Sequence, residues 1–285
     1  MKSSLGLEAK LPVFDLLKEA IVLLWAKRNI VIPMFLPVIF VLATVDFISE
    51  VYFSPVVTDD AQVVEVDPMV EAGQSMKQLG MSLIAMLFSI LMATAAHRFT
   101  LLPRDQWYTN GLHGWGKNEW RYLGRAVVIG FIAGIAALVP FFIGAATGSQ
   151  EGMAIGGTIG GLIAMYLFGR LSITLPEVAI GKQGDLKRAW ALSEGNGTRM
   201  VIVVLLIPIA MIIPAAILYW LESHLATYFA LLVVYVGSLI SVTILSLSYQ
   251  FLIDFYEPES LAPEVLNEEL EQPAEKEGES GRFDA

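Results

Sequence analysis

The sequence predicts an all-α membrane protein: a polytopic bundle of six transmembrane helices with short amphipathic interfacial helices on its cytoplasmic face. Of its 285 residues, 55% are hydrophobic and 16% are charged, whereas soluble domains carry roughly 25% charged residues. The apolar residues come in long runs, without the alternation of a surface and a core. A helix needs about 20 apolar residues to cross a bilayer core of about 30 Å. The runs that meet this requirement span residues 30–48, 79–96, 126–146, 153–169, 200–221 and 228–253.

These spans divide the chain into three parts, which are a cytoplasmic N-terminal segment (1–28), the transmembrane domain (29–253) and an acidic tail (254–285). The net charge of −10 arises almost entirely from the tail. Because the tail is rich in Glu and Pro, we expect it to be mostly disordered. A short amphipathic stretch within it is a candidate docking site for a protein partner.

The basic residues predict the orientation of the spans. All but one of the 18 Lys and Arg residues fall in the segments on one side, and the exception is Lys77. Basic loops stay in the cytoplasm, so we expect both termini there. The first apolar run starts near Ile30 without a cleavage site after it, which predicts an uncleaved helix rather than a signal peptide.

Three cytoplasmic segments favour helices that lie on the membrane surface. Residues 12–28 place apolar side chains at helical spacing, with charged residues opposite, but are too interrupted to span. This segment should meet the first span at an elbow. Residues 185–193 form a similar short segment, with Asp185 as its N-cap and Gly195 as its stop. Residues 118–125 occupy the same place before the third span, which suggests three copies of a unit of surface helix, span, outer turn and span.

Small residues at a four-residue period predict close helix packing between spans three and four. A glycine-lined pore or a lipid-facing groove is the alternative. The glycines concerned are Gly130, Gly134, Gly152, Gly156 and Gly160.

Pro140, Pro208 and Pro214 lie inside spans and predict helix kinks, because each removes an intrahelical hydrogen bond. In some transporters such freed carbonyls coordinate ions. The sixth span is rich in Ser and Thr, whose hydroxyls can bond to their own backbone or to a neighbouring helix. A polar path for a substrate is the other interpretation.

The sequence predicts no catalytic, cofactor-binding or metal-ligating residue, and therefore no enzyme. No span carries a charged residue near its centre, and such residues are typical of proton relays and ion paths. His97, His113 and His224 are isolated and lack metal-ligand spacing. No phosphate loop or nucleophile elbow appears, and the absence of cysteine removes thiolate sites.

The most distinctive run lies between the fourth and fifth spans and indicates a return to the surface, a turn and a capped interfacial helix. Its characteristic residues are Arg170, Pro176, Gly184, Leu186, Trp190, Ser193, Gly195 and Asn196. This pattern resembles the YciC-like family and the membrane domain attached to some glycerophosphodiester phosphodiesterases. The resemblance implies a multi-pass protein of the bacterial inner membrane whose biochemical role is largely uncharacterised. The chain has no room for a soluble phosphodiesterase domain, so the resemblance does not imply that activity.

Two functional hypotheses follow. The first is a non-enzymatic membrane scaffold or regulator that acts through membrane lipids or protein partners, since basic residues attract anionic headgroups by about 1 kcal/mol each. Topology alone would also explain those charges. The alternative is a carrier or channel for an uncharged or amphipathic solute or lipid, based on the prolines of the fifth span and the polar sixth span. No nucleic-acid partner is expected, and the oligomeric state is left open.

Overall fold

The structure is a computed structural model that describes residues 9–53 and 68–257, with side chains from residue 72 in the second range. Six helical segments in these ranges are long and apolar enough to cross a membrane. The prediction of an all-α, six-span architecture is confirmed, and the chain is a multi-pass membrane protein. The spans are α2 (Arg28–Phe53), α3 (Pro68–Leu101), α4 (Lys117–Ala145), α5 (Gln150–Leu171), the continuous run α8 (Gly197–Val201), η2 (Ile202–Leu206) and α9 (Ile207–Tyr219), and α10 (His224–Tyr256).

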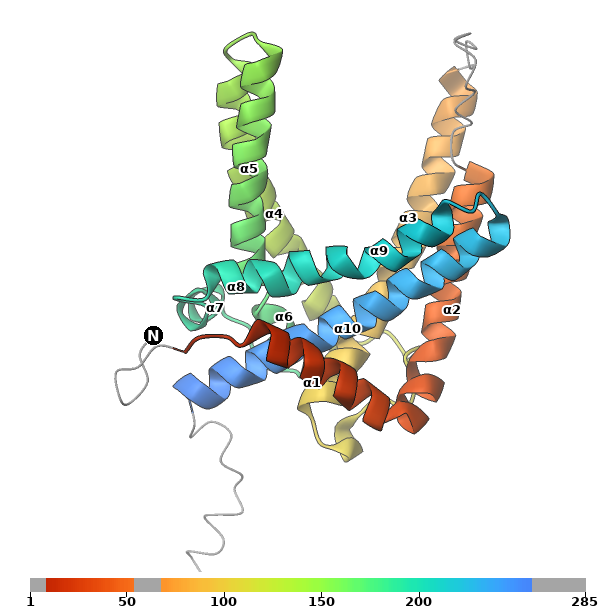
Figure 1. The fold of residues 1–285 in the computed structure, drawn as a ribbon, viewed down its shortest axis with the longest axis vertical. Helices are drawn as coiled ribbons and strands as arrows, with labels where there is room; N and C mark the ends of the chain where they lie inside the picture. Colours follow the sequence, from red (N-terminus) through yellow and green to blue (C-terminus); the bar gives the residue numbers. More distant parts are fainter. Residues whose placement is uncertain (1–8, 54–67, 258–285) are drawn as a thin grey trace, which may run out of the picture.

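The spans form three antiparallel pairs (Figure 1). The pairs α2/α3 and α4/α5 stand upright, whereas α9 and α10 cross obliquely between them. Most helices extend beyond the predicted apolar runs, and α3 reaches Leu101 although its run was predicted to end at residue 96. Helices continue past the hydrocarbon because polar residues at their ends do not interrupt the backbone hydrogen bonds.

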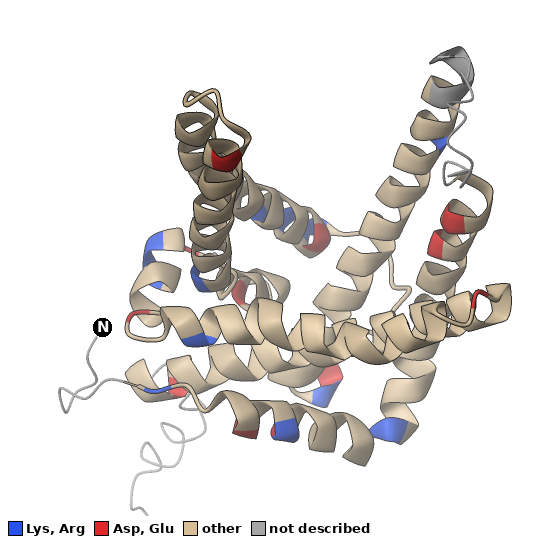
Figure 2. Ribbon diagram, turned by 45° about the horizontal axis from the view of Figure 1, so that its top comes forward, with Lys and Arg blue, Asp and Glu red and all other residues tan. Residues whose placement is uncertain are grey.

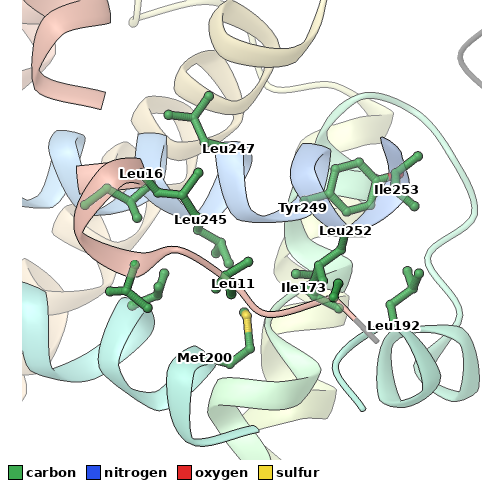
Figure 3. Packing of buried hydrophobic residues seen from close by; sticks show 14 of the residues in the cluster. Leu11, Leu16, Ile173, Leu192, Met200, Leu245, Leu247, Tyr249, Leu252 and Ile253 are labelled. Carbon is green, nitrogen blue, oxygen red and sulfur yellow. The ribbon is translucent and has the colours of Figure 1, made fainter. Parts of the chain in front are cut away.

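Helix α10 is the centre of the fold. Of its most apolar stretch, 56% is buried within the protein, compared with 11% for α4. Its C-terminal half packs against α1 (Val13–Ala26) and α8, where Leu245 and Leu252 share one buried cluster with Leu16 and Met200 (Figure 3). Its other half packs against α2 and α3. The least buried pair, α4/α5, projects from this core (Figure 1).

Two of the predicted surface helices are separate elements. Helix α1 ends at Ala26, and Lys27 forms the elbow that leads into α2. Helix α7 (Leu186–Leu192) starts after Asp185, whose carboxylate accepts a hydrogen bond of 3.0 Å from the Lys187 amide. Gly195 follows with a φ of +75°, a conformation that glycine adopts without strain. The N-cap and the stop are therefore confirmed.

The third predicted surface helix is wrong, because residues 118–125 are the first turns of α4 and no break separates them from the span. Gly124 lies inside this helix, and a single glycine does not end one. The unit of surface helix and span therefore appears before α2 and before α8, but not before α4. A further short helix, α6 (Thr174–Ala179), was not predicted, and all six of its residues are buried.

Lys and Arg gather at the end of the molecule that holds α1, α6 and α7 (Figure 2). Phe14, Val22 and Trp25 project from the outer side of α1 and are 79%, 56% and 71% exposed. An apolar outer face on a helix that already packs on α10 is typical of an element lying at the boundary of headgroups and acyl chains.

The serine and threonine hydroxyls of the sixth span bond to their own backbone, which is one of the arrangements predicted for them. Each donates to the carbonyl four residues earlier, over 2.8–3.0 Å. The donors are Ser238, Ser241, Thr243, Ser246 and Ser248. This arrangement satisfies the hydroxyls inside the helix.

Glycines allow α4 and α5 to touch backbone to backbone. A Cβ atom on Gly156 would lie 2.4 Å from the Pro140 carbonyl oxygen, and one on Gly152 would lie 2.8 Å from that of Gly144. Gly160 approaches the Ala137 carbonyl in the same way. The two predicted glycines on α4, which are Gly130 and Gly134, face open space and do not take part.

The three predicted prolines all lie in helices. Pro140 is inside α4 and Pro214 is inside α9, whereas Pro208 is the second residue of α9, which follows the π-helical turn η2. The sequence did not predict this turn. Proline removes the amide that would bond to the carbonyl four residues earlier, and a wider turn is one way in which a helix accommodates that loss.

A matched pair of substitutions tests the packing of the α4/α5 hairpin. A Cβ on Gly160 would lie 2.3 Å from the Ala137 carbonyl oxygen, whereas nothing lies within 4 Å of one on Gly161. We expect Gly160→Ala to lower the free energy of unfolding by about 1–3 kcal/mol through overpacking. Gly161→Ala should leave it unchanged or raise it by up to about 1 kcal/mol, since alanine is the better helix former. Thermal unfolding in detergent measures both, and equal shifts would contradict the close approach of the two backbones.

Candidate functional site

The distinctive run between α5 and α8 is built around Arg170, which is 6% exposed at the end of α5. Its Nε donates to Ser193 Oγ over 2.9 Å, and its Nη2 donates to the Trp190 carbonyl. The guanidinium also lies 3.5 Å from the centre of the Trp190 ring. The arginine thereby fixes α7 against the end of α5, and its donors are used within the protein.

Asn196 ties the start of the chain to this run. Its side-chain oxygen accepts a hydrogen bond of 2.9 Å from the Leu11 amide, and its Nδ2 donates to the Ala9 carbonyl over 2.7 Å. Asn196 is 1% exposed. Because this buried side-chain amide bonds to both the Ala9 carbonyl and the Leu11 amide, it holds residues 9–11 in place, and we call it the Asn196 clamp.

The other characteristic residues of the run support its turns. Pro176 is buried within α6, and Leu186 packs against the cluster that contains Leu175 and Val178 of the same helix. A Cβ on Gly184 would lie 2.6 Å from Val178 Cγ2, so the chain needs glycine there to pass α6 closely. The residues of the predicted motif therefore take part in separate structural contacts, at α7, at residues 9–11 and at α6.

A buried carboxylate connects α6, α7 and α10. Glu177 is 2% exposed and accepts a hydrogen bond from Arg188, which also donates from Nε to Glu257 over 3.1 Å. Burial raises the pKa of Glu177 above its usual value, although the nearby positive charges of Arg188 and Lys182 act in the opposite direction. This ion pair network joins the C-terminal end of α10 to α6 and α7.

A second polar cluster joins α3, α4 and α10. His97 is fully buried, and its Nδ1 lies 2.7 Å from Ser246 Oγ. Because the Ser246 hydroxyl donates to the Val242 carbonyl, its oxygen accepts from His97 Nδ1. Nε2 of the ring then accepts from the Tyr122 hydroxyl at 3.4 Å. The histidine that the sequence left isolated therefore links three spans.

The connection between α3 and α4 holds a third cluster around Glu119. Its carboxylate accepts hydrogen bonds from the Tyr108 hydroxyl at 2.9 Å, from His113 Nε2 at 3.0 Å and from the Gly116 amide at 2.9 Å. Burial lowers the pKa of His113 below its usual value, which favours the neutral ring as the donor. Three donors around one carboxylate fix the connection against the start of α4.

A basic hollow lies where the first turns of α4 face the α6–α7 connection. Its volume is 540 Å³. Three basic residues and no acidic one line it, together with glycines and apolar side chains. The lining residues of this basic hollow are Arg121, Gly124, Arg125, Val128, Val178, Lys182, Gln183 and Gly184.

The cations of the basic hollow have different settings. Arg125 is half-buried and donates from Nη2 to the Gly184 carbonyl, which holds it on the wall of the hollow. Arg121 and Lys182 are exposed at its edge. Glu177 lies close enough that Arg125 and Lys182 both act to lower its pKa, so this buried carboxyl offsets part of the positive potential. A planar guanidinium beside a lysine matches the oxygens of a phosphate.

The sequence does not predict the basic hollow, and its three cations there indicate only the orientation of the spans. Arg121 and Arg125 are four residues apart on α4 and therefore share a face, which is a signal that the sequence does contain. Lys182 comes from another element 57 positions beyond Arg125, and only the fold brings it to the same place.

The Asn196 clamp makes a prediction about the start of the chain. Asn196→Ala removes the partners of the Ala9 carbonyl and the Leu11 amide, which should cost about 1–3 kcal/mol. Lys10 lies between these residues and is exposed, so trypsin should cleave after it roughly tenfold faster for each 1.4 kcal/mol lost. Thr198→Ala, at an exposed position of α8, is the control. Equal cleavage rates in the two variants would refute the clamp.

Comparison with known proteins does not identify a relative of this chain. No family model matches the chain, and no curated protein or solved structure matches it either. The resemblance to the YciC-like family therefore stays a prediction from the motif. The basic hollow is the feature from which a function can be argued.

Proposed function

We propose that this protein is a non-enzymatic scaffold or regulator of the bacterial inner membrane that binds the headgroups of anionic inner-leaflet lipids. The observation that carries the proposal is the basic hollow, in which Arg121, Arg125 and Lys182 line one cavity. Basic pockets between membrane helices on the cytoplasmic side bind the headgroups of acidic lipids.

The charges set the strength of this interaction. Each basic residue near the surface attracts an anionic headgroup by about 1 kcal/mol, so three contribute about 3 kcal/mol. This corresponds to a preference of roughly a hundredfold for an anionic lipid over a zwitterionic one. The neighbouring Glu177 reduces the value, which makes it an upper bound.

The position of the basic hollow favours a lipid over a soluble anion. Val128 lies about 10 Å along α4 from Arg121, at 1.5 Å per residue, and is 43% exposed. Phe131 and Ile135 continue this exposed apolar surface along the helix, at 67% and 48%. A phospholipid whose phosphate contacts these cations would thus have its acyl chains beside apolar side chains.

The rest of the proposal concerns orientation and partners. We place the basic end of the molecule, with α1 and both termini, in the cytoplasm, because nearly all Lys and Arg residues flank that end. Membership of the YciC-like family would agree with this placement. The acidic tail after Glu257 lies outside the described residues, and we keep it as a site for a protein partner.

One observation favours a second candidate function, that of a carrier or channel for an uncharged or amphipathic solute or lipid. The π-helical turn η2 occurs in the fifth span and ends two residues before Pro208, and such turns are frequent at functional sites. The serines of α10 count against a polar path, since they bond to their own backbone. We therefore rank this function second.

Neutralising the basic hollow should weaken the binding of anionic lipid. In Arg121→Gln/Lys182→Gln, two cations are lost, and at about 1 kcal/mol each the preference for phosphatidylglycerol should fall roughly thirtyfold. Thermal unfolding in detergent, titrated with phosphatidylglycerol or phosphatidylcholine, measures this preference through the stabilisation that each lipid gives.

Arg104→Gln is the matched control, because Arg104 is an exposed arginine near the basic end that does not line the hollow. It should keep the preference for phosphatidylglycerol. If the double variant also keeps it, the basic hollow does not bind anionic lipid and the proposed function fails.

Cysteine labelling tests the orientation, since the chain has no cysteine of its own. A cysteine at Glu151, in the first turn of α5, should react with a membrane-impermeant maleimide in intact cells. Cysteines at Lys117 and Glu194 should react only after the cells are opened. The reverse pattern would place the basic end outside the cell.

A further inference from the structure

A second hollow, separate from the basic hollow, lies at the elbow between α1 and α2. It is a groove of 380 Å³ between α1, α2 and α10, and its lining is apolar except for Arg28. Ile32 and Leu36 of α2 form one side, and Val236 and Ile240 of α10 form the other. We call it the elbow groove.

We propose that the elbow groove holds one acyl chain of an anionic inner-leaflet phospholipid, whose headgroup contacts Arg28. The proposal does not rest on the basic hollow, because the two hollows share no residue.

The length of the elbow groove fits a single leaflet. Along α2 it runs from Arg28 to Ile39, which is about 16 Å at 1.5 Å per residue. Half of a hydrocarbon core of about 30 Å is about 15 Å. The elbow groove therefore starts at the interface and ends near the middle of the bilayer, as an acyl chain of the inner leaflet does.

The single charge lies where a headgroup would be. Arg28 opens α2 at the elbow, beside Trp25, which is 71% exposed. Its Nη1 donates to the Trp25 carbonyl over 3.3 Å, and its guanidinium lies 5.5 Å from the centre of the Trp25 ring. A guanidinium has five N–H donors, so this fixed arginine can also donate to a phosphate.

The shape of the elbow groove favours a lipid chain over a protein helix. Its walls come from three helices, and Ile32 and Val236 remain 53% and 46% exposed at its opening. A helix with its side chains is about 10–12 Å in diameter, which is too wide to fit into a groove of 380 Å³. A flexible hydrocarbon chain can enter between the walls and cover these side chains.

Photocrosslinking tests the proposal with the full-length protein in phosphatidylcholine vesicles. The probes are phosphatidylglycerol and phosphatidylcholine that carry a diazirine in the middle of one acyl chain, and labelled peptides are mapped by mass spectrometry. We expect the phosphatidylglycerol probe to label residues 32–39 and 236–240 more strongly than α5. Even labelling of all lipid-exposed helices would overturn the proposal, as would chain-to-chain crosslinks in place of lipid at the groove.

Substitutions separate the chain from the headgroup. Leu36→Trp fills the elbow groove and should abolish this labelling. Ile32→Phe is a milder second variant, for use if Leu36→Trp does not fold, and should reduce the labelling. Leu162→Trp on α5, at a position that is 63% exposed, is the control and should leave the labelling intact. Labelling that persists in both filled variants refutes the site.

The headgroup is tested by Arg28→Gln. This variant should reduce labelling by the phosphatidylglycerol probe about fivefold, the share of one basic residue, and leave the phosphatidylcholine probe unaffected. An equal effect on both probes would refute the role of Arg28. The basic-hollow variant Arg121→Gln/Lys182→Gln should not change labelling of the elbow groove, so the failure of one proposal is distinguishable from that of the other.

Discussion

Lipid tails neither donate nor accept hydrogen bonds, so each polar group inside the hydrocarbon must find its partner within the protein. This constraint explains how α10 can be both the most buried span and the one richest in hydroxyls, since its serines bond to the preceding turn. It also explains the link from His97 to Ser246 and Tyr122, which joins three spans by polar contacts in a region where hydrophobicity alone gives helices no reason to associate. The architecture therefore combines these internal polar contacts with the apolar clusters around α10.

The same logic applies at the basic end, where three polar side chains between the end of α5 and the start of α8 have partners within the protein. Arg170 holds α7, Asn196 holds the start of the chain, and Arg188 joins α6 to the end of α10. What distinguishes the basic hollow from these clusters is that its cations line a cavity open to a ligand. The proposed ligand is a lipid headgroup because three basic side chains in one cavity attract an anion.

The sequence predicts the spans well because hydrophobic length is a local property that each run carries by itself. It also predicts the cap at Asp185 and the stop at Gly195, which depend on neighbouring residues. It fails at residues 118–125, where nothing local separates a surface helix from the first turns of a span, and at α6, which is buried by helices distant in sequence. The sequence predicts neither hollow, because Lys182 and Val236 reach their positions only through tertiary packing.

The docking of residues 9–11 has a consequence for biosynthesis. The Ala9 amide donates to the Tyr256 hydroxyl across 247 positions of sequence, and Asn196 bonds the same segment across 187. The beginning of the chain cannot reach its final contacts until the last helix has left the ribosome and entered the bilayer. A chain that stops before Tyr256 lacks the partner of the Ala9 amide, and one that stops before Asn196 also lacks the partners of the Leu11 amide and the Ala9 carbonyl.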